Sequence, residues 1–236
     1  MSLSSPATRG LNRTQTTYSV NVSRAALAGN NNLSALTVTS RTLTPAFSAN
    51  TTTYSVDVGS GVTSVTVTAT LQNTNATMTI EGQGTPSGQG RSISLGDAGT
   101  TKAIDILVTA PNGRSKPYTI NVRKAASSDS KLSALTATVG TTSLTLSPPF
   151  DPGMTTYTVD TSATDTVNVS ATKADANALM SAQGSVIAQA GTPTGQVTIA
   201  PPGTEIVIAV SAQDQASTTQ YTVTVNRAAA SPPPPP

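Results

Sequence analysis

The sequence repeats itself, with similar segments returning roughly 100 residues apart, and this repeat limits the fold more than any other feature. Leu33-Ser34-Ala35-Leu36-Thr37 returns as Leu132-Ser133-Ala134-Leu135-Thr136, and Thr53-Tyr54-Ser55-Val56-Asp57 returns as Thr156-Tyr157-Thr158-Val159-Asp160. The segments keep their order in both copies, so we expect two tandem units of one fold. A unit of this size can bury a core of its own.

Within each copy, apolar residues alternate with Thr, Ser, Asn and charged residues at every second position. This alternation predicts half-buried strands, and the β-branched Val and Thr favour strands over helices. In the first copy the expected strands lie at 33–38, 54–58, 65–69, 78–80, 93–95, 104–108 and 118–122. About seven short strands in a unit of this length predict an all-β chain of two tandem immunoglobulin-like antiparallel β-sandwiches.

Both copies end in an alternating strand that begins with Tyr, at 118–122 and 221–225, and a third such strand stands at 18–22. We interpret the third one as the last strand of a truncated preceding repeat, whose unpaired backbone would dock on a sheet edge. The expected organisation is a cloning remnant plus this strand at 1–26, repeat 1 at 27–126, repeat 2 at 127–230 and a polyproline linker at 231–236.

The order of these motifs resembles that of the cadherin-like β-sandwich domain family. Over 33–126 and 132–229, both copies contain Leu-x-x-Leu, Leu-x-Pro-x-Phe, Tyr-x-Val, a Val-x-Val-x-Ala strand and a final Tyr strand. The resemblance implies an immunoglobulin-like sandwich of the kind that occurs as tandem modules in bacterial secreted and surface proteins. It implies no catalytic residues.

The side chains of most enzyme active sites are missing from the sequence. The chain has no His and no Cys, which excludes a Ser-His-Asp triad, a thiolate nucleophile, a disulfide and a zinc site built on imidazole or thiolate. Its 13 basic and 11 acidic residues are scattered singly, so nucleic-acid binding is not expected. No apolar stretch approaches the ~20 residues of a membrane helix.

The 5 Tyr and 2 Phe stand at equivalent places in the repeats. They form the sets Tyr18/Tyr118/Tyr221, Tyr54/Tyr157 and Phe47/Phe150. We interpret them as core residues whose hydroxyl groups reach backbone partners, the alternative being a platform for stacking sugars. The glycine-rich segment 82–90 joins two expected strands, so it predicts a hairpin loop and not a phosphate-binding loop, which would open a helix.

No metal and no cofactor is expected. Calcium between two repeats would need several oxygen ligands held close together, yet the junction 127–131 has Asp129 as its only carboxylate. No two acidic residues are closer in sequence than Asp160 and Asp165. Asp57 and Asp160, which are equivalent, are predicted to end a strand and cap a turn.

A spontaneous isopeptide bond between a lysine and an asparagine is an option in surface sandwiches. Lys102, Lys116 and Lys173 are the candidate donors. We expect the strand positions of these lysines to face solvent, which argues against such a bond.

We therefore expect no enzyme activity. The predicted function is a structural or adhesion module, a spacer or presenter from a larger bacterial exported or cell-surface protein whose export signal lies outside this sequence. The expected partners are neighbouring domains of the same polypeptide, and the expected state is a monomer or a weak dimer through edge strands.

The alternative is a carbohydrate- or protein-binding module that uses loops or a sheet edge of the second repeat. The two copies differ most at 174–189, which makes this segment the best place for a surface glycan or a protein partner. The candidate ligand-binding residues are Asp175, Asn177, Met180, Gln183 and Gln189.

Overall fold

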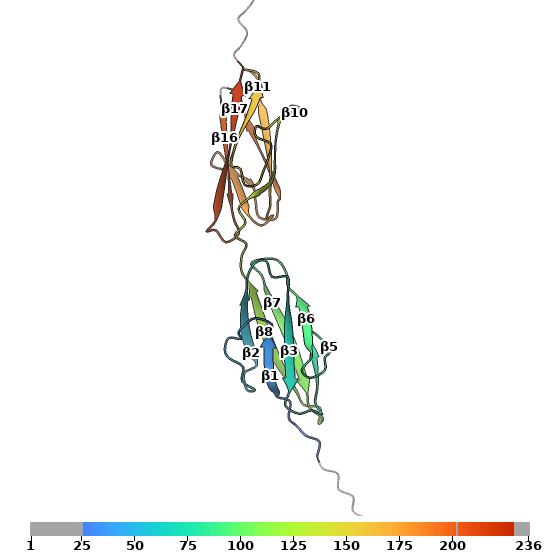
Figure 1. Cartoon of the computed structure of the whole chain (residues 1–236). Helices are drawn as coiled ribbons and strands as arrows, with labels where there is room; N and C mark the ends of the chain where they lie inside the picture. Colours follow the sequence, from blue (N-terminus) through green and yellow to red (C-terminus); the bar gives the residue numbers. More distant parts are fainter. Residues whose placement is uncertain (1–25, 202, 229–236) are drawn as a thin grey trace, which may run out of the picture.

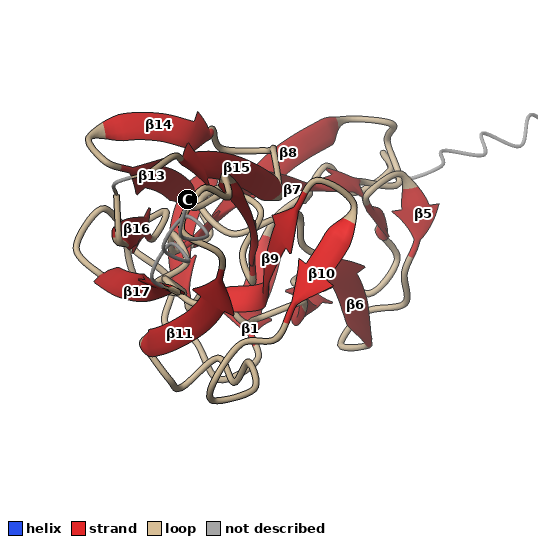
Figure 2. Cartoon of the chain, turned by 90° about the horizontal axis from the view of Figure 1, so that it is seen from above, coloured by secondary structure: helices blue, strands red, loops and turns tan. Residues whose placement is uncertain are grey.

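The computed structural model describes residues 26–201 and 203–228, and within these ranges the chain contains strands and no helix. Figure 1 shows two domains that follow one another along the chain, and Figure 2 shows the same strands from above. The first domain contains β1 (Leu33–Val38), β2 (Thr53–Val58), β3 (Ser64–Leu71), β4 (Thr77–Ile80), β5 (Gln83–Gly84), β6 (Gly90–Ser94), β7 (Thr101–Thr109) and β8 (Ser115–Lys124). The second contains β9 (Leu132–Val139), β10 (Thr142–Leu144), β11 (Thr156–Thr161), β12 (Val167–Lys173), β13 (Leu179–Ala182), β14 (Ser185–Ala188), β15 (Thr194–Ile199), β16 (Glu205–Ser211) and β17 (Thr218–Arg227).

Each domain is a sandwich of two sheets. In the first domain the strand orders are β1-β3-β6 and β2-β8-β7-β4-β5. In the second they are β10-β9-β12-β15 and β11-β17-β16-β13-β14. The predicted all-β fold of two tandem sandwiches is confirmed, and all seven strands expected in the first copy are present.

The alternating residues fill the space between the two sheets of each domain. In β8, Tyr118, Ile120 and Val122 are buried while their neighbours face outwards, and β17 repeats the pattern with Tyr221, Val223 and Val225. Each domain has its own cluster of buried apolar residues. Burial of such side chains is the main stabilising contribution to each sandwich.

The expected antiparallel pairing holds for most strand pairs but is wrong for one pair in each domain. β2 runs parallel to β8, from Thr53 opposite Thr119 to Val58 opposite Lys124. β11 runs parallel to β17 in the same way. The reason is that the chain leaves β1 (or β9), crosses to the other sheet and returns in the direction of the last strand, a crossover that the alternation of residues does not encode.

The glycine-rich segment 82–90 is not the predicted hairpin loop between two neighbouring strands. It contains the short strand β5, which pairs with β4, and then carries the chain to β6 in the opposite sheet. Glu81 and Gly82 both have positive φ, at 51° and 72°, which is the geometry of the tight turn between β4 and β5. The second domain repeats this turn with Gln183 and Gly184.

Two expectations lie outside the described residues. The strand predicted at 18–22, with Tyr18, falls within 1–25, and the whole of the polyproline linker predicted at 231–236 follows the last described residue.

Candidate functional site

A buried lysine organises the segment in which the two repeats differ most. Lys173 ends β12 and is 3% exposed, so the prediction that its side chain faces solvent is wrong. Its Nζ donates hydrogen bonds to the carbonyl oxygens of Ala176 at 3.0 Å and Gln189 at 2.9 Å, and to that of Ala178. The three N–H groups of one ammonium group therefore hold the 174–178 loop against the end of β14.

Burial and a neighbouring carboxylate have opposite effects on the pKa of Lys173. Burial lowers the pKa of its amine, and the nearby carboxylate of Asp175 acts in the opposite direction. The equivalent residue of the first repeat is the buried Leu71, which ends β3. The second repeat has thus exchanged an apolar core contact for a polar one.

The structure brings only some of the candidate ligand-binding residues together. The Gln189 carbonyl binds the Lys173 amine and Asp175 lies near it, and the Asp175 carboxylate accepts a hydrogen bond from the Asn177 N–H at 2.9 Å. Gln183 lies in the turn between β13 and β14, at the opposite end of β13 from the 174–178 loop. Met180 is fully buried in the core, so its side chain is not available to a ligand in the folded domain.

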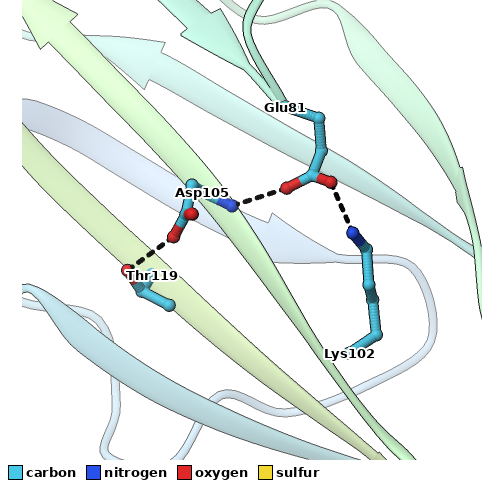
Figure 3. Close-up of polar contacts among 4 residues, drawn as sticks. All are labelled: Glu81, Lys102, Asp105 and Thr119. Carbon is cyan, nitrogen blue, oxygen red and sulfur yellow. Dashed lines mark hydrogen bonds and ion pairs between the residues drawn. The ribbon is translucent and has the colours of Figure 1, made fainter.

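The outer face of the larger sheet in the first repeat carries a polar network that sequence reasoning missed (Figure 3). Glu81 follows β4, and its carboxylate accepts hydrogen bonds from Lys102 Nζ at 2.6 Å and from the Asp105 N–H at 2.9 Å. The Asp105 carboxylate in turn accepts one from the Thr119 hydroxyl at 2.9 Å. The network crosses three neighbouring strands, β4, β7 and β8, and ties them together on the solvent side.

The hydrogen bonds of Glu81 set its charge. The ammonium group of Lys102 and the N–H of Asp105 hold the pKa of the Glu81 carboxyl below its usual value. Because both carboxylate oxygens are engaged within the protein, this glutamate is placed as a structural anion and not as a free acid or base. Gln183 stands at the equivalent position of the second repeat, where Thr204 takes the place of Lys102.

The two equivalent aspartates bind across the parallel strand pair instead of capping a turn. Asp57 in β2 receives two hydrogen bonds from the Arg123 guanidinium in β8, the shorter at 2.8 Å. Asp160 in β11 receives one from the Asn226 amide in β17 at 2.9 Å. The prediction that these residues cap turns is therefore wrong, although both lie near the end of their strand.

The other candidate isopeptide lysines have ordinary polar partners. Lys102 pairs with Glu81, and Lys116 Nζ donates to the Asn32 side-chain oxygen at 2.9 Å and to the Ala49 carbonyl at 2.6 Å. Lys116 and Asn32 thus stand at contact distance, but no described carboxylate is bonded to either one to move the protons that amide formation requires.

The described residues form no metal cluster and no membrane helix. Within 26–201 and 203–228, no three His, Cys, Asp or Glu side chains gather closely enough to hold a metal ion. Asp129 lies in a polar hollow of about 350 Å³ between the repeats, and its carboxylate accepts a hydrogen bond from the Lys131 N–H. No helix that could span a membrane is found among the described residues.

The joint between the repeats is bonded from both sides by one glutamine. The Gln213 side chain, on the loop between β16 and β17, accepts a hydrogen bond from the Ser127 N–H and donates one to the Ala98 carbonyl of the first repeat, each at 3.0 Å. The Asp214 N–H donates to the Ser127 carbonyl at 3.0 Å. A Cβ on Gly99 would lie 2.7 Å from Gln213 Nε2, and the φ of Gly99 is +75°, so only glycine fits this contact.

The seven aromatic positions are core positions wherever they are described. Tyr54, Tyr118, Tyr157 and Tyr221 are at most 1% exposed. Phe47 stacks on Tyr54 and Phe150 stacks on Tyr157. The four tyrosine rings are therefore used for packing, as predicted, while Phe47 and Phe150 are half-buried and pack against the two cores.

Comparison with known proteins places this geometry in a family. The cadherin-like beta sandwich domain family matches residues 33–125 and 133–228. A protein of Evansella cellulosilytica, named "Putative membrane protein", is 41% identical over 98 residues, which cover 41% of this chain and 14% of that protein. The chain therefore spans a small part of this relative.

Solved structures with similar strands are distant. The Clostridium thermocellum CbhA fibronectin(III)-like modules are 12% identical, with 82% of this chain and 95% of that chain covered and a TM-score of 0.22. SGBP-B of the Bacteroides ovatus mixed-linkage glucan utilization locus, in complex with a mixed-linkage heptasaccharide, is 13% identical, with 82% and 71% covered and a TM-score of 0.21. Scores this low transfer no function. The two family matches together cover most of the sequence, and the chain belongs to the cadherin-like beta sandwich domain family.

Proposed function

We propose that this chain is a non-catalytic structural module that spaces or presents the neighbouring parts of a larger exported or cell-surface protein. The observation that carries the proposal is the bonded joint, in which the Gln213 side chain holds both Ala98 of the first repeat and Ser127 of the connecting segment. The side-chain amide of this glutamine hydrogen-bonds to two backbone segments and so fixes them to one another.

The path of the chain through each sandwich supports this role. The first repeat begins at β1 and ends with β8, and the two ends of the described chain lie at opposite ends of the molecule in Figure 1. Neighbouring segments would therefore be held apart and not brought together. The location outside the cell is part of the proposal, and a relative named as a membrane protein is consistent with it.

Small-angle X-ray scattering tests the spacer. A compact particle of 236 residues has a radius of gyration of about 18 Å, and we expect a clearly larger value with a distance distribution that has separate maxima within and between repeats. A single maximum with a radius near the compact value would overturn the proposal.

A second candidate function is the binding of a glycan or a protein at the segment around Lys173. The observation that favours it is that Asp175 Oδ2 is buried but accepts no hydrogen bond from the described residues, while the side chain of Gln189 is exposed nearby. Glycan arrays and pull-downs test it with the whole chain and with Asp175→Asn and Gln189→Ala variants. Binding that is unchanged in both variants would place any ligand elsewhere.

A further inference from the structure

The last strand of each repeat is held on both sides within its sheet. β8 lies between β2, to which it is parallel, and β7, to which it is antiparallel. All six residues of β2 are in register with β8, and the bonds from the Thr119 N–H to the Thr52 carbonyl and from the Ala125 N–H to the Val58 carbonyl mark the ends of this contact. The strand by which the chain leaves the domain is thus a central strand.

The parallel direction of β2 and β8 decides how tension would act on them. Tension reaches β2 from its N-terminal end and leaves through the C-terminal end of β8. In a parallel pair these two ends lie at opposite ends of the contact. Tension therefore slides the two strands past one another and loads all their hydrogen bonds at once. If the same strands were pulled apart from one shared end, the bonds would break one after another.

The first strand is attached more weakly and is loaded first. β1 is an edge strand that pairs only with β3. The Tyr118 hydroxyl in β8 accepts a hydrogen bond from the Leu33 N–H at 3.2 Å, close to where the Thr52 carbonyl binds the neighbouring Thr119. Residues 33 and 52 therefore lie at the same end of the sandwich, and release of the segment between them moves the load directly to the start of β2.

The second repeat has the same arrangement. β11 is in parallel register with β17 from Thr156 opposite Thr222 to Thr161 opposite Arg227. The Tyr221 hydroxyl accepts a hydrogen bond from the Leu132 N–H at 3.1 Å. Side chains cross the parallel contact in both repeats. In the first, Asp57 and Arg123 form an ion pair, and in the second the Asn226 side-chain amide donates a hydrogen bond to the Asp160 carboxylate.

We propose that each repeat is built to bear tension along the chain, with the parallel pairs β2–β8 and β11–β17 as the force-bearing contacts. This inference rests on the proposed spacer role, because a spacer between a surface and a partner is the element that tension would load. It predicts two steps when the first repeat is pulled from its ends. Release of residues 33–52 gives about 7 nm of length, and rupture of β2 from β8 then gives the rest.

The test compares two pulling directions in the same protein by single-molecule force spectroscopy. The chain has no Cys, so pairs of introduced cysteines provide unique handles in the whole chain. Ala28→Cys with Ala125→Cys loads β2 and β8 in shear. Gly61→Cys with Ala125→Cys pulls the same strands apart from one end, since residues 61 and 125 follow neighbouring strand ends, and a Cβ on Gly61 meets open space.

We expect total length gains of about 30 nm for the first pair and about 23 nm for the second, which show that the whole segment between the two handles has unfolded. We expect the rupture force to be at least about twofold higher in shear, because the bonds of β2 to β8 then break together. Equal rupture forces for the two pairs would overturn the force-bearing contact.

The two proposals fail separately. If the rupture forces are equal and scattering shows two separated domains, the spacer proposal stands and the proposal of a force-bearing contact is wrong. A compact particle in scattering would remove the spacer, while the ratio of forces in the first repeat would still decide the role of β2 and β8.

Discussion

The Tyr118 hydroxyl joins the last strand of the first repeat to the beginning of the first strand, because it accepts a hydrogen bond from the Leu33 N–H at 3.2 Å. It also donates one to the Ala49 carbonyl at 2.9 Å. Tyr221 makes the same two bonds in the second repeat, to the Leu132 N–H and the Pro152 carbonyl. Burial raises the pKa of Tyr221, so its hydroxyl stays a donor at any ordinary pH. Besides packing in the core, the tyrosine of the last strand therefore links this strand to the start of the first strand in each domain.

Replacing Tyr118 by Phe keeps the ring and removes these bonds. The Leu33 N–H is then left buried without a partner, which costs about 1–3 kcal/mol of unfolding free energy. Urea denaturation measures this loss. Tyr221→Phe is the matched variant and should destabilise the second repeat by a similar amount. In the pulling experiment Tyr118→Phe should lower the force of the step of about 7 nm and leave the main rupture unchanged. If the unfolding free energies of Tyr118→Phe and Tyr221→Phe equal that of the native chain within experimental error, the hydroxyl groups do not stabilise the domains.

The alternation of the sequence predicts which face of each strand is buried, and the core confirms it. Ile104, Ile106 and Val108 in β7 all point inwards as expected. Alternation does not predict which strands are neighbours, because parallel and antiparallel pairing both require the same alternation of buried and exposed side chains. The direction of β2 relative to β8 therefore had to come from the structure.

The same reasoning explains why Lys173 was missed. Lys173 stands at an inward position of the alternation in β12, but a lysine at a strand end is normally expected to face solvent, since the cost of burying an ammonium group is high without partners. The available signal was that Lys173 occupies the place of Leu71 in the first repeat. The three carbonyl oxygens that satisfy it come from backbone at 176, 178 and 189, and backbone acceptors leave no trace in sequence.

Replacing Glu81 by Gln tests the polar network on the outer face. The bonded partners lower the pKa of Glu81 below 4.5, so the folded state binds the proton less readily than the unfolded state. The stabilising contribution is therefore present above about pH 4.5 and is lost as the pH falls through the lowered pKa. Since Lys102 is partly exposed, we expect a loss of less than about 1 kcal/mol in the variant at pH 7.

The measurement is the difference in unfolding free energy between the native chain and Glu81→Gln at pH 7 and at pH 3. The difference should shrink towards pH 3. Gln183→Glu in the second repeat is the control, because it places a glutamate in the equivalent turn, where Thr204 stands in place of Lys102, and should bring no gain at pH 7. A difference that is constant over this range would show that the charge of Glu81 does not stabilise the sheet.

Replacing Lys173 tests the buried amine. Lys173→Ala removes the donor from three carbonyl oxygens and leaves a cavity, so we expect a loss of about 2–4 kcal/mol in the second repeat. Lys173→Leu, which copies Leu71, fills the space without restoring the donors and should lose less. Hydrogen exchange should report faster opening of residues 174–178 in both variants. The exposed Lys131→Ala is the control, and an equal effect at Lys131 and Lys173 would contradict the role assigned to the amine.

Replacing Gln213 by Ala tests the joint between the repeats. The variant loses the bonds to Ser127 and Ala98 but touches neither core, so we expect the unfolding free energy of each repeat to change by less than about 0.5 kcal/mol. The two repeats should instead reorient more freely, which lowers the agreement of residual dipolar couplings with a single arrangement and broadens the interdomain maximum in scattering. Gln220→Ala, an exposed position in β17, is the matched control. If the Gln213 variant keeps the couplings of the native chain, the amide is not what sets the angle between the repeats.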